Sequence, residues 1–207
     1  MKKYLAVLLI IAGVFASYAP GLRDGFVWDD TALILRDPLI RSWRLIPEGF
    51  NHFLFVDATA SDFYRPLQRL TYTLDYAAFA FRPGLYHAAS ILWHVAAAIA
   101  LFVFAEELLL AFGIEQRKRL WITFLAVLVW AIHPVESAAV AYVSGRADPL
   151  AAMFGFFGLY LFLLSLRTIG RRRLFFLIGA GVALLLSASL ARIGELTPAN
   201  SGKTHSR

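Results

Sequence analysis

Five apolar runs divide the chain, and polar or basic segments separate them. They are Tyr4–Ala19, Tyr86–Leu110, Leu120–Ile132, Leu150–Leu166 and Leu174–Leu190. A helix that crosses a bilayer needs about 20 such residues. The first run is slightly short, and the third crosses only if Arg117–Arg119 snorkel or the helix continues past His133. The pattern predicts an all-α integral membrane protein, a polytopic helical bundle of about five spans.

The first run allows a second interpretation, which is a cleaved signal peptide. Lys2 and Lys3 precede it, and Ser17-Tyr18-Ala19 supplies the small residues that a cleavage site needs. Pro20 follows directly and argues against cleavage. We therefore expect a retained anchor.

The polar segment 20–85 is rich in aromatic residues, which is not typical of a solvated linker. Aromatic rings together with arginine and proline suit a segment at the membrane interface. Pro38, Pro47 and Pro66 interrupt it. We expect a long outer loop of short interfacial helices within a membrane domain of residues 1–187.

Composition supports this interpretation, because 59% of the residues are hydrophobic and only 16% are charged. Cysteine is absent, which excludes thiolate chemistry and disulfides. The net charge of +6 does not indicate nucleic-acid binding, since the basic residues cluster between spans. The positive-inside rule places Lys2-Lys3, Arg117–Arg119 and Arg167–Arg173 in the cytoplasm. We expect a bacterial inner-membrane protein with a cytoplasmic N-terminus, whose loops 20–85 and 133–149 share the outer face.

Asp29 and Asp30 are the first candidates for chemistry. Two adjacent acids beside an apolar run are costly unless they serve a purpose or lie in water. They suit a general base or a divalent-metal site, although the metal is not specified. The alternative is that Asp30 caps a short helix beginning at Thr31. Both hold if Asp30 caps and Asp29 faces the substrate.

Three further groups collect polar residues near the outer face. Arg65 is held extended by Pro66 and suits a phosphate, or else it binds lipid headgroups. His87, Ser90 and His94 share one helix face, where a hydrogen-bonding role is favoured over a metal site. The last group is His133, Glu136, Arg146 and Asp148, for which the alternative is an ion pair of Arg146 with Asp148 or Glu136 that only fixes the loop. The chain contains no P-loop, GxGxxG, HExxH or GxSxG motif.

Taken together, these motifs resemble a known family. Phe26-Val27-Trp28-Asp29-Asp30, Tyr64-Arg65-Pro66-Leu67, the His87–His94 face and the run HPVESAAVAYVSGRAD at 133–148 are similar to the N-terminal membrane part of the tetratricopeptide-repeat transmembrane O-mannosyltransferases and their bacterial relatives. These are GT-C glycosyltransferases. The resemblance covers residues 5–187. It departs at Ser90, where the family usually has asparagine, and after residue 187.

The resemblance implies transfer of a sugar from a polyprenyl-phosphate donor to a hydroxyl on a protein or glycan acceptor at the periplasmic or luminal side. Asp29 or Asp30 is then the base or holds a divalent ion, and Arg65, His133 and Arg146 are candidates for the donor phosphate. The lipid tail lies between spans. The chain is expected to be the front part of a longer enzyme, with an unstructured tail at 188–207 and no activity alone. A non-catalytic scaffold is the alternative, and a transporter ranks last because few charges lie within the spans.

Overall fold

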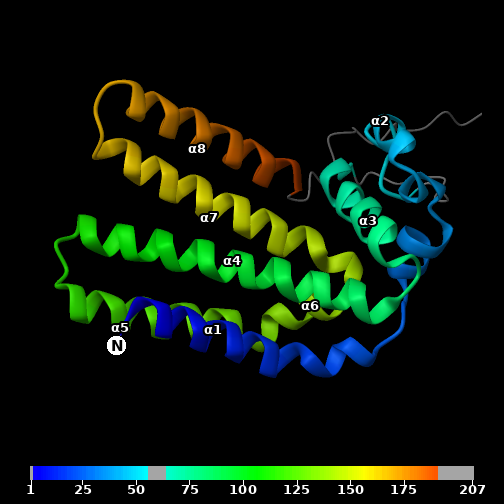
Figure 1. The fold of residues 1–207 in the computed structure, drawn as a ribbon, viewed down its shortest axis with the longest axis horizontal. Helices are drawn as coiled ribbons and strands as arrows, with labels where there is room; N and C mark the ends of the chain where they lie inside the picture. Colours follow the sequence, from blue (N-terminus) through cyan, green and yellow to red (C-terminus); the bar gives the residue numbers. More distant parts are fainter. Residues whose placement is uncertain (1, 56–63, 191–207) are drawn as a thin grey trace, which may run out of the picture.

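The computed structural model describes residues 2–55 and 64–190, and the regular elements of that part are all helices (Figure 1). The expectation for the tail concerns mainly residues 191–207, which lie outside the described residues. The α-helices are α1 (Lys3–Tyr18), α2 (Ile46–Gly49), α3 (Pro66–Phe79), α4 (Pro83–Ala111), α5 (Gln116–Ala131), α6 (Ser137–Ala141), α7 (Ala147–Leu166) and α8 (Arg171–Leu190).

The predicted bundle of about five spans is confirmed. Four helical segments are long and apolar enough to cross a membrane, and they run over Lys3–Arg23, Pro83–Ala111, Val143–Leu166 and Arg171–Leu190. The third apolar run continues past His133, as its length requires, but the helix bends. Gln116–Ala131 and Pro134–Ala141 meet at 46°, because Pro134 cannot donate the next helical hydrogen bond.

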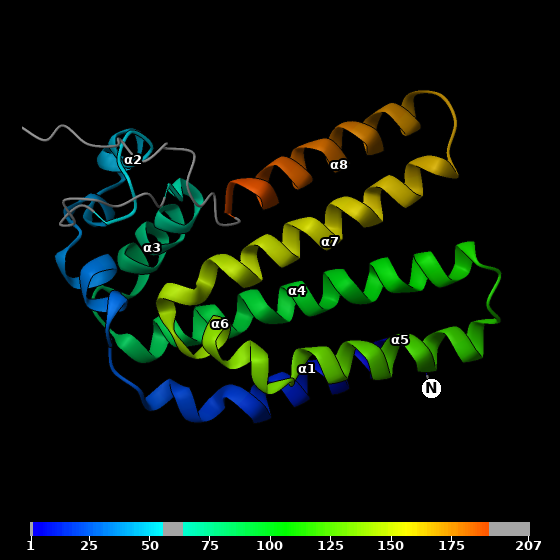
Figure 2. The same cartoon turned by 180° about the vertical axis from the view of Figure 1, so that it is seen from behind.

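The bundle is held by two packing contacts on either side of α4 (Figures 1 and 2). Helices α1, α4 and α5 share one apolar core, which includes Ile10, Ile91 and Phe124. On the other side of α4, helix α7 packs along α4, and α8 packs on α7. A Cβ at Gly158 would lie 3.0 Å from Leu184 Cγ and 3.2 Å from Ala180 O, so this glycine permits the close approach of α7 and α8.

Residues 24–55 and 64–82 fold against one end of the bundle, and we call this part the loop module. Its prolines begin helices, since Pro38, Pro47 and Pro66 each lie in a first turn, where the missing N–H costs nothing. The buried Arg69 side chain binds Asp37 Oδ2 at 2.9 Å and also donates to the carbonyls of Gly49, His52, Phe53 and Leu54. One guanidinium therefore gathers the irregular stretch before α3.

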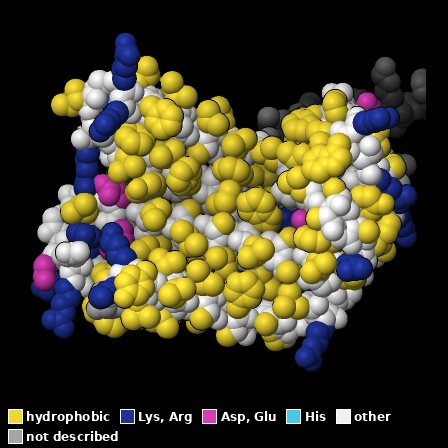
Figure 3. Space-filling model, in the orientation of Figure 1, with side chains coloured by type: hydrophobic (Ala, Val, Ile, Leu, Met, Phe, Trp, Pro, Cys, Tyr) yellow, Lys and Arg dark blue, Asp and Glu magenta, His cyan; other side chains and the backbone are white. Residues whose placement is uncertain are grey.

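The opposite end of the bundle carries the basic residues that flank the spans, and we call it the basic end (Figure 3). Lys3 Nζ and Arg119 Nε lie 2.8 and 3.5 Å from the carboxylate of the buried Glu106. Arg167 Nη1 lies 2.6 Å from Glu107 Oε1. Three basic segments that are distant in sequence thus meet at one end, as the charge pattern requires if the spans alternate in direction.

This arrangement predicts the accessibility of single cysteines, which the cysteine-free chain makes simple to test. A cysteine at Tyr142, which is 45% exposed and lies beside the loop module between α6 and α7, should react with an impermeant thiol reagent in intact cells. A cysteine at the exposed Lys118 of the basic end should react only after the membrane is opened. Labelling of position 118 in intact cells would reverse the orientation.

Candidate functional site

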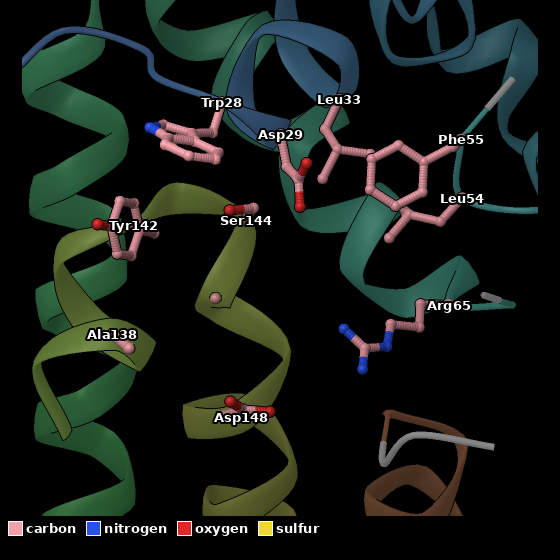
Figure 4. A pocket seen from close by; sticks show the side chains of 11 residues that line it. Trp28, Asp29, Leu33, Leu54, Phe55, Arg65, Ala138, Tyr142, Ser144 and Asp148 are labelled. Carbon is pink, nitrogen blue, oxygen red and sulfur yellow. The ribbon is translucent and has the colours of Figure 1, made fainter. Parts of the chain in front are cut away.

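A pocket of about 750 Å³ opens between the loop module and the segment from α6 to the start of α7 (Figure 4). Its walls combine apolar, aromatic and charged side chains. They are Trp28, Asp29, Leu33, Leu54, Phe55, Arg65, Ala138, Tyr142, Ser144, Gly145 and Asp148. The volume is in the range of small-ligand sites.

Three of the predicted site residues meet in this pocket, and they come from separate parts of the chain. Asp29 precedes a helical turn of the loop module, Arg65 directly precedes α3, and Asp148 lies in the first turn of α7. Figure 4 shows Asp29 between the rings of Trp28 and Phe55, with Arg65 and Asp148 lower in the pocket. Two carboxylates and one guanidinium therefore border a mostly apolar space.

Asp30 is buried and is not a helix cap, so that expectation was wrong. Its side chain makes no capping hydrogen bond at Thr31–Arg36. Its carboxylate instead accepts hydrogen bonds from Ser144 N at 2.7 Å and Val143 N at 3.4 Å. The adjacent acids thus differ in role, because one faces the pocket and the other holds the loop that forms its far wall.

Arg146 is fully buried and joins three segments. Its guanidinium pairs with Asp75 of α3, donates to Thr71 Oγ1 at 3.3 Å, and donates to Tyr86 O at 2.9 Å and Ser90 Oγ at 3.2 Å on α4. The alternative of an ion pair with Asp148 or Glu136 is therefore wrong. In the described part of the chain, the ion-pair partner of the buried guanidinium is Asp75, the one acidic residue of α3.

The Asp75 side chain is buried from solvent. Burial raises the pKa of its carboxyl above the ordinary value, although the Arg146 guanidinium acts to lower it. The Arg146 Cζ atom also lies 5.0 Å from the centre of the Tyr72 ring, within the range of a cation–π contact. Arg146 is thus a positioning residue, and its charge is not offered to the pocket.

The Val143–Arg146 turn is held on both sides. Gln68 Nε2 donates to Ser144 O at 2.7 Å, and the Tyr72 hydroxyl donates to Val143 O at 2.9 Å. Gly145 faces the pocket on one side and α6 on the other. A Cβ there would lie 2.5 Å from Ala138 O, so no side chain fits without a shift of the backbone.

The histidines and Glu136 lie apart from the pocket lining. His94 binds Ala131 O at 2.8 Å through Nε2, with its ring 5.0 Å from Trp130, and so joins α4 to α5. His87 is also buried in α4. His133 Nδ1 accepts from Val135 N at 3.2 Å. Glu136, three residues later in the chain, is half-buried.

Sequence reasoning missed the α3 residues that hold the site. They are Gln68, Thr71, Tyr72 and Asp75, all of which are buried. Their spacing of three and four residues places them on one helix face, and that pattern was readable. The sequence analysis predicts short interfacial helices in this segment from its aromatic residues and prolines, and it does not consider the polar face of α3.

Within the described ranges, no three His, Asp or Glu side chains lie close enough together to hold a metal ion. The pocket carboxylates Asp29 and Asp148 remain suitable groups for hydroxyl or cation contacts.

The chain is similar to several animal proteins. Protein O-mannosyl-transferase TMTC2 of Homo sapiens is 33% identical over 171 residues, which cover 78% of the chain and 18% of that relative. TMTC3 of Mus musculus is 30% identical over 72% of the chain and 16% of its own length. Protein O-mannosyl-transferase F38B6.6 of Caenorhabditis elegans is 26% identical over 75% of the chain and 22% of its length. The chain thus spans about a fifth of these relatives. No family model and no solved structure matches it.

The Arg146 cluster predicts a large loss of stability in single variants. Arg146→Met leaves Asp75 buried without its cation, and we expect the free energy of unfolding to fall by about 3–5 kcal/mol. Asp75→Asn should have an effect of the same order, and the double variant should lose less than the sum of the two. Thermal unfolding in detergent measures all three.

The exposed Arg44 gives a matched control for the loss of an arginine charge. Arg44→Met should change the melting temperature by less than about 1 °C, because exposed charges contribute little. Equal melting temperatures for Arg146→Met and Arg44→Met would contradict a structural role for the buried cluster.

Proposed function

We propose that this chain, which belongs to the TMTC family of protein O-mannosyl-transferases, forms part of the site of a membrane glycosyltransferase. The proposed reaction moves a sugar from a polyprenyl-phosphate donor to an acceptor hydroxyl. The observation that supports it most strongly is the pocket that Asp29, Asp148 and Arg65 share at the module end of the bundle. The chain spans about a fifth of the length of these relatives, so the activity of the complete relatives is a proposal for this chain.

Asp29 is the proposed general base. It lines the pocket and is exposed to it, whereas the Asp30 carboxylate is occupied by two backbone N–H groups. In the reaction, the acceptor oxygen forms a bond to the anomeric carbon and its proton passes to Asp29. The bond from that carbon to the phosphate oxygen breaks, and polyprenyl phosphate leaves with the bonding electrons. A positioned base of this kind contributes about 10²- to 10⁴-fold.

Arg65 is the proposed partner of the donor phosphate. It lines the same pocket. Its backbone before Pro66 has φ −139° and ψ 66°, which is outside the helical region but is not the extended conformation that the sequence predicts. A planar guanidinium binds phosphate oxygens bidentately. Negative charge grows on the leaving phosphate as the glycosidic bond breaks, so a cation there favours the transition state over the ground state.

The pocket lies where a lipid-linked donor can reach it. It is at the module end of the spans, and the apolar faces of α7 and α8 extend from it along the bundle (Figure 3). The polyprenyl tail would lie against such a face, with the phosphate and sugar in the pocket. By the positive-inside rule this end faces the periplasm of a bacterium, or the lumen in a eukaryotic cell.

The names of the relatives make mannose the first sugar to test and a protein hydroxyl the first acceptor. We therefore propose that the pocket binds a hexosyl donor, and mannose is the sugar used as the probe.

The test uses a chimaera in which the chain replaces the matched 171-residue segment of human TMTC2. Microsomes that contain it receive polyprenyl-phosphate [³H]mannose and an acceptor polypeptide. We expect Asp29→Asn to lower the transfer rate by about 10²-fold or more, because the amide cannot accept the hydroxyl proton. Asp24→Asn, which changes an exposed acid outside the pocket lining, should leave the rate unchanged.

Two outcomes would count against the proposal. An inactive chimaera beside active unmodified TMTC2 would show that this chain does not supply the transferase site. An active chimaera with equal rates for Asp29→Asn and the unaltered chain would remove Asp29 from the reaction.

A further inference from the structure

Trp28 combines three features that seldom occur together. Its backbone has a φ of +50°, its side chain is 86% exposed, and its indole lines the pocket beside Asp29. A left-handed backbone is unfavourable for a bulky side chain, and such residues gather at functional sites. Among the described residues, Ala80 is the only other non-glycine with a positive φ.

The backbone turn at Trp28 separates the two carboxylates that follow it. Asp30 N donates to Val27 O at 3.0 Å, and Thr31 donates to Trp28 O through N at 3.1 Å and through Oγ1 at 2.7 Å. Asp30 is anchored to the 143–144 backbone on one side, and Asp29 faces the pocket on the other. The left-handed residue is therefore held in place by several bonds, and its conformation sets the directions of the indole and of Asp29.

A role as an ordinary interface anchor does not account for this geometry. Aromatic anchors of a membrane interface need an exposed ring and no strained backbone. Trp43, in the same loop module, fits such an anchor. Its side chain is 53% exposed, and its backbone does not have a positive φ. The difference between the two tryptophans points to a ligand at Trp28.

The chemistry around the indole suits a sugar ring. Tyr142 lies on the same side of the pocket as Trp28, and Asp29 and Asp148 lie within the pocket (Figure 4). A pyranose has an apolar face of C–H groups, which packs on an aromatic face, and a rim of hydroxyls, which donate to carboxylates. Flat aromatic surfaces and carboxylates in one pocket match both parts of that ligand.

We infer that Trp28 is the stacking surface for the hexose of the lipid-linked donor, with Asp148 as an acceptor for its hydroxyls. This inference rests on the proposed function, and it adds the part of the pocket that recognises the sugar. Trp28 is a binding residue in this scheme and takes no part in proton transfer.

The experiment compares two ligands that differ only in the sugar. The full chain in lipid nanodiscs is titrated with radiolabelled polyprenyl-phosphate mannose and, separately, with polyprenyl phosphate. We expect Trp28→Ala to weaken binding of the mannosyl lipid by about tenfold and to leave binding of polyprenyl phosphate unchanged. Trp28→Phe should retain most of the difference. Trp43→Ala, the control, should affect neither ligand.

A second measurement tests the conformation of the residue. Trp28→Gly removes the ring at a position where glycine is favoured, so the melting temperature should stay equal or rise while binding of the mannosyl lipid falls as in Trp28→Ala. A structural role for the indole would lower the melting temperature in both variants and would contradict the inference.

The remaining outcomes separate this inference from the proposed function. Equal weakening of both lipids in Trp28→Ala would make Trp28 a lipid contact, and unchanged binding of both would remove it from the site. Either result would overturn the inference and leave a donor pocket in place. If the unaltered chain binds neither lipid, the donor site and the sugar contact both fail.

Discussion

The buried guanidinium of Arg146 is the contact on which the site depends. It joins α3, α4 and the start of α7 through Asp75, Thr71, Tyr86 O and Ser90. A charge removed from water is costly unless a counter-charge and hydrogen bonds replace the solvent. Those partners come from segments that are separate in sequence, so the loop module has one favourable orientation against the bundle. That orientation places Asp29 and Arg65 opposite Asp148.

The pocket wall is therefore held by buried residues that do not line it, together with Gly145, which does. Asp30 and Gln68 bind the backbone of Val143 and Ser144 from two directions, and Gly145 allows that turn to approach α6 closely. Preorganised groups act on a substrate without being rearranged at the moment of reaction. In this chain the rigid turn carries Ser144 and leads into Asp148, while the strained backbone at Trp28 directs Asp29. The two adjacent acids thus differ in place, since Asp30 binds the backbone of the turn and Asp29 lines the pocket.

The sequence by itself determined the membrane class and the course of the chain. Apolar runs longer than a typical core helix have few stable places outside a bilayer, so the spans follow from hydropathy. The basic clusters predicted which connections share one end, and the Glu106 and Glu107 contacts agree with that grouping. Two prolines determined local boundaries, because α3 begins at Pro66 and the helix that starts with α5 bends at Pro134. These are local properties, which is why local sequence predicts them.

Only the tertiary structure decided the partners of the polar groups. Arg146 had nearby acids at Glu136 and Asp148, yet it binds Asp75, which is 71 positions away. Asp30 had a helix start beside it, yet it binds Ser144 N, which is 114 positions away. Sequence spacing ranks partners by proximity along the chain, whereas a buried charge takes whichever partner packing brings within reach in the absence of water. The division between the pocket residues and their supports follows from that packing.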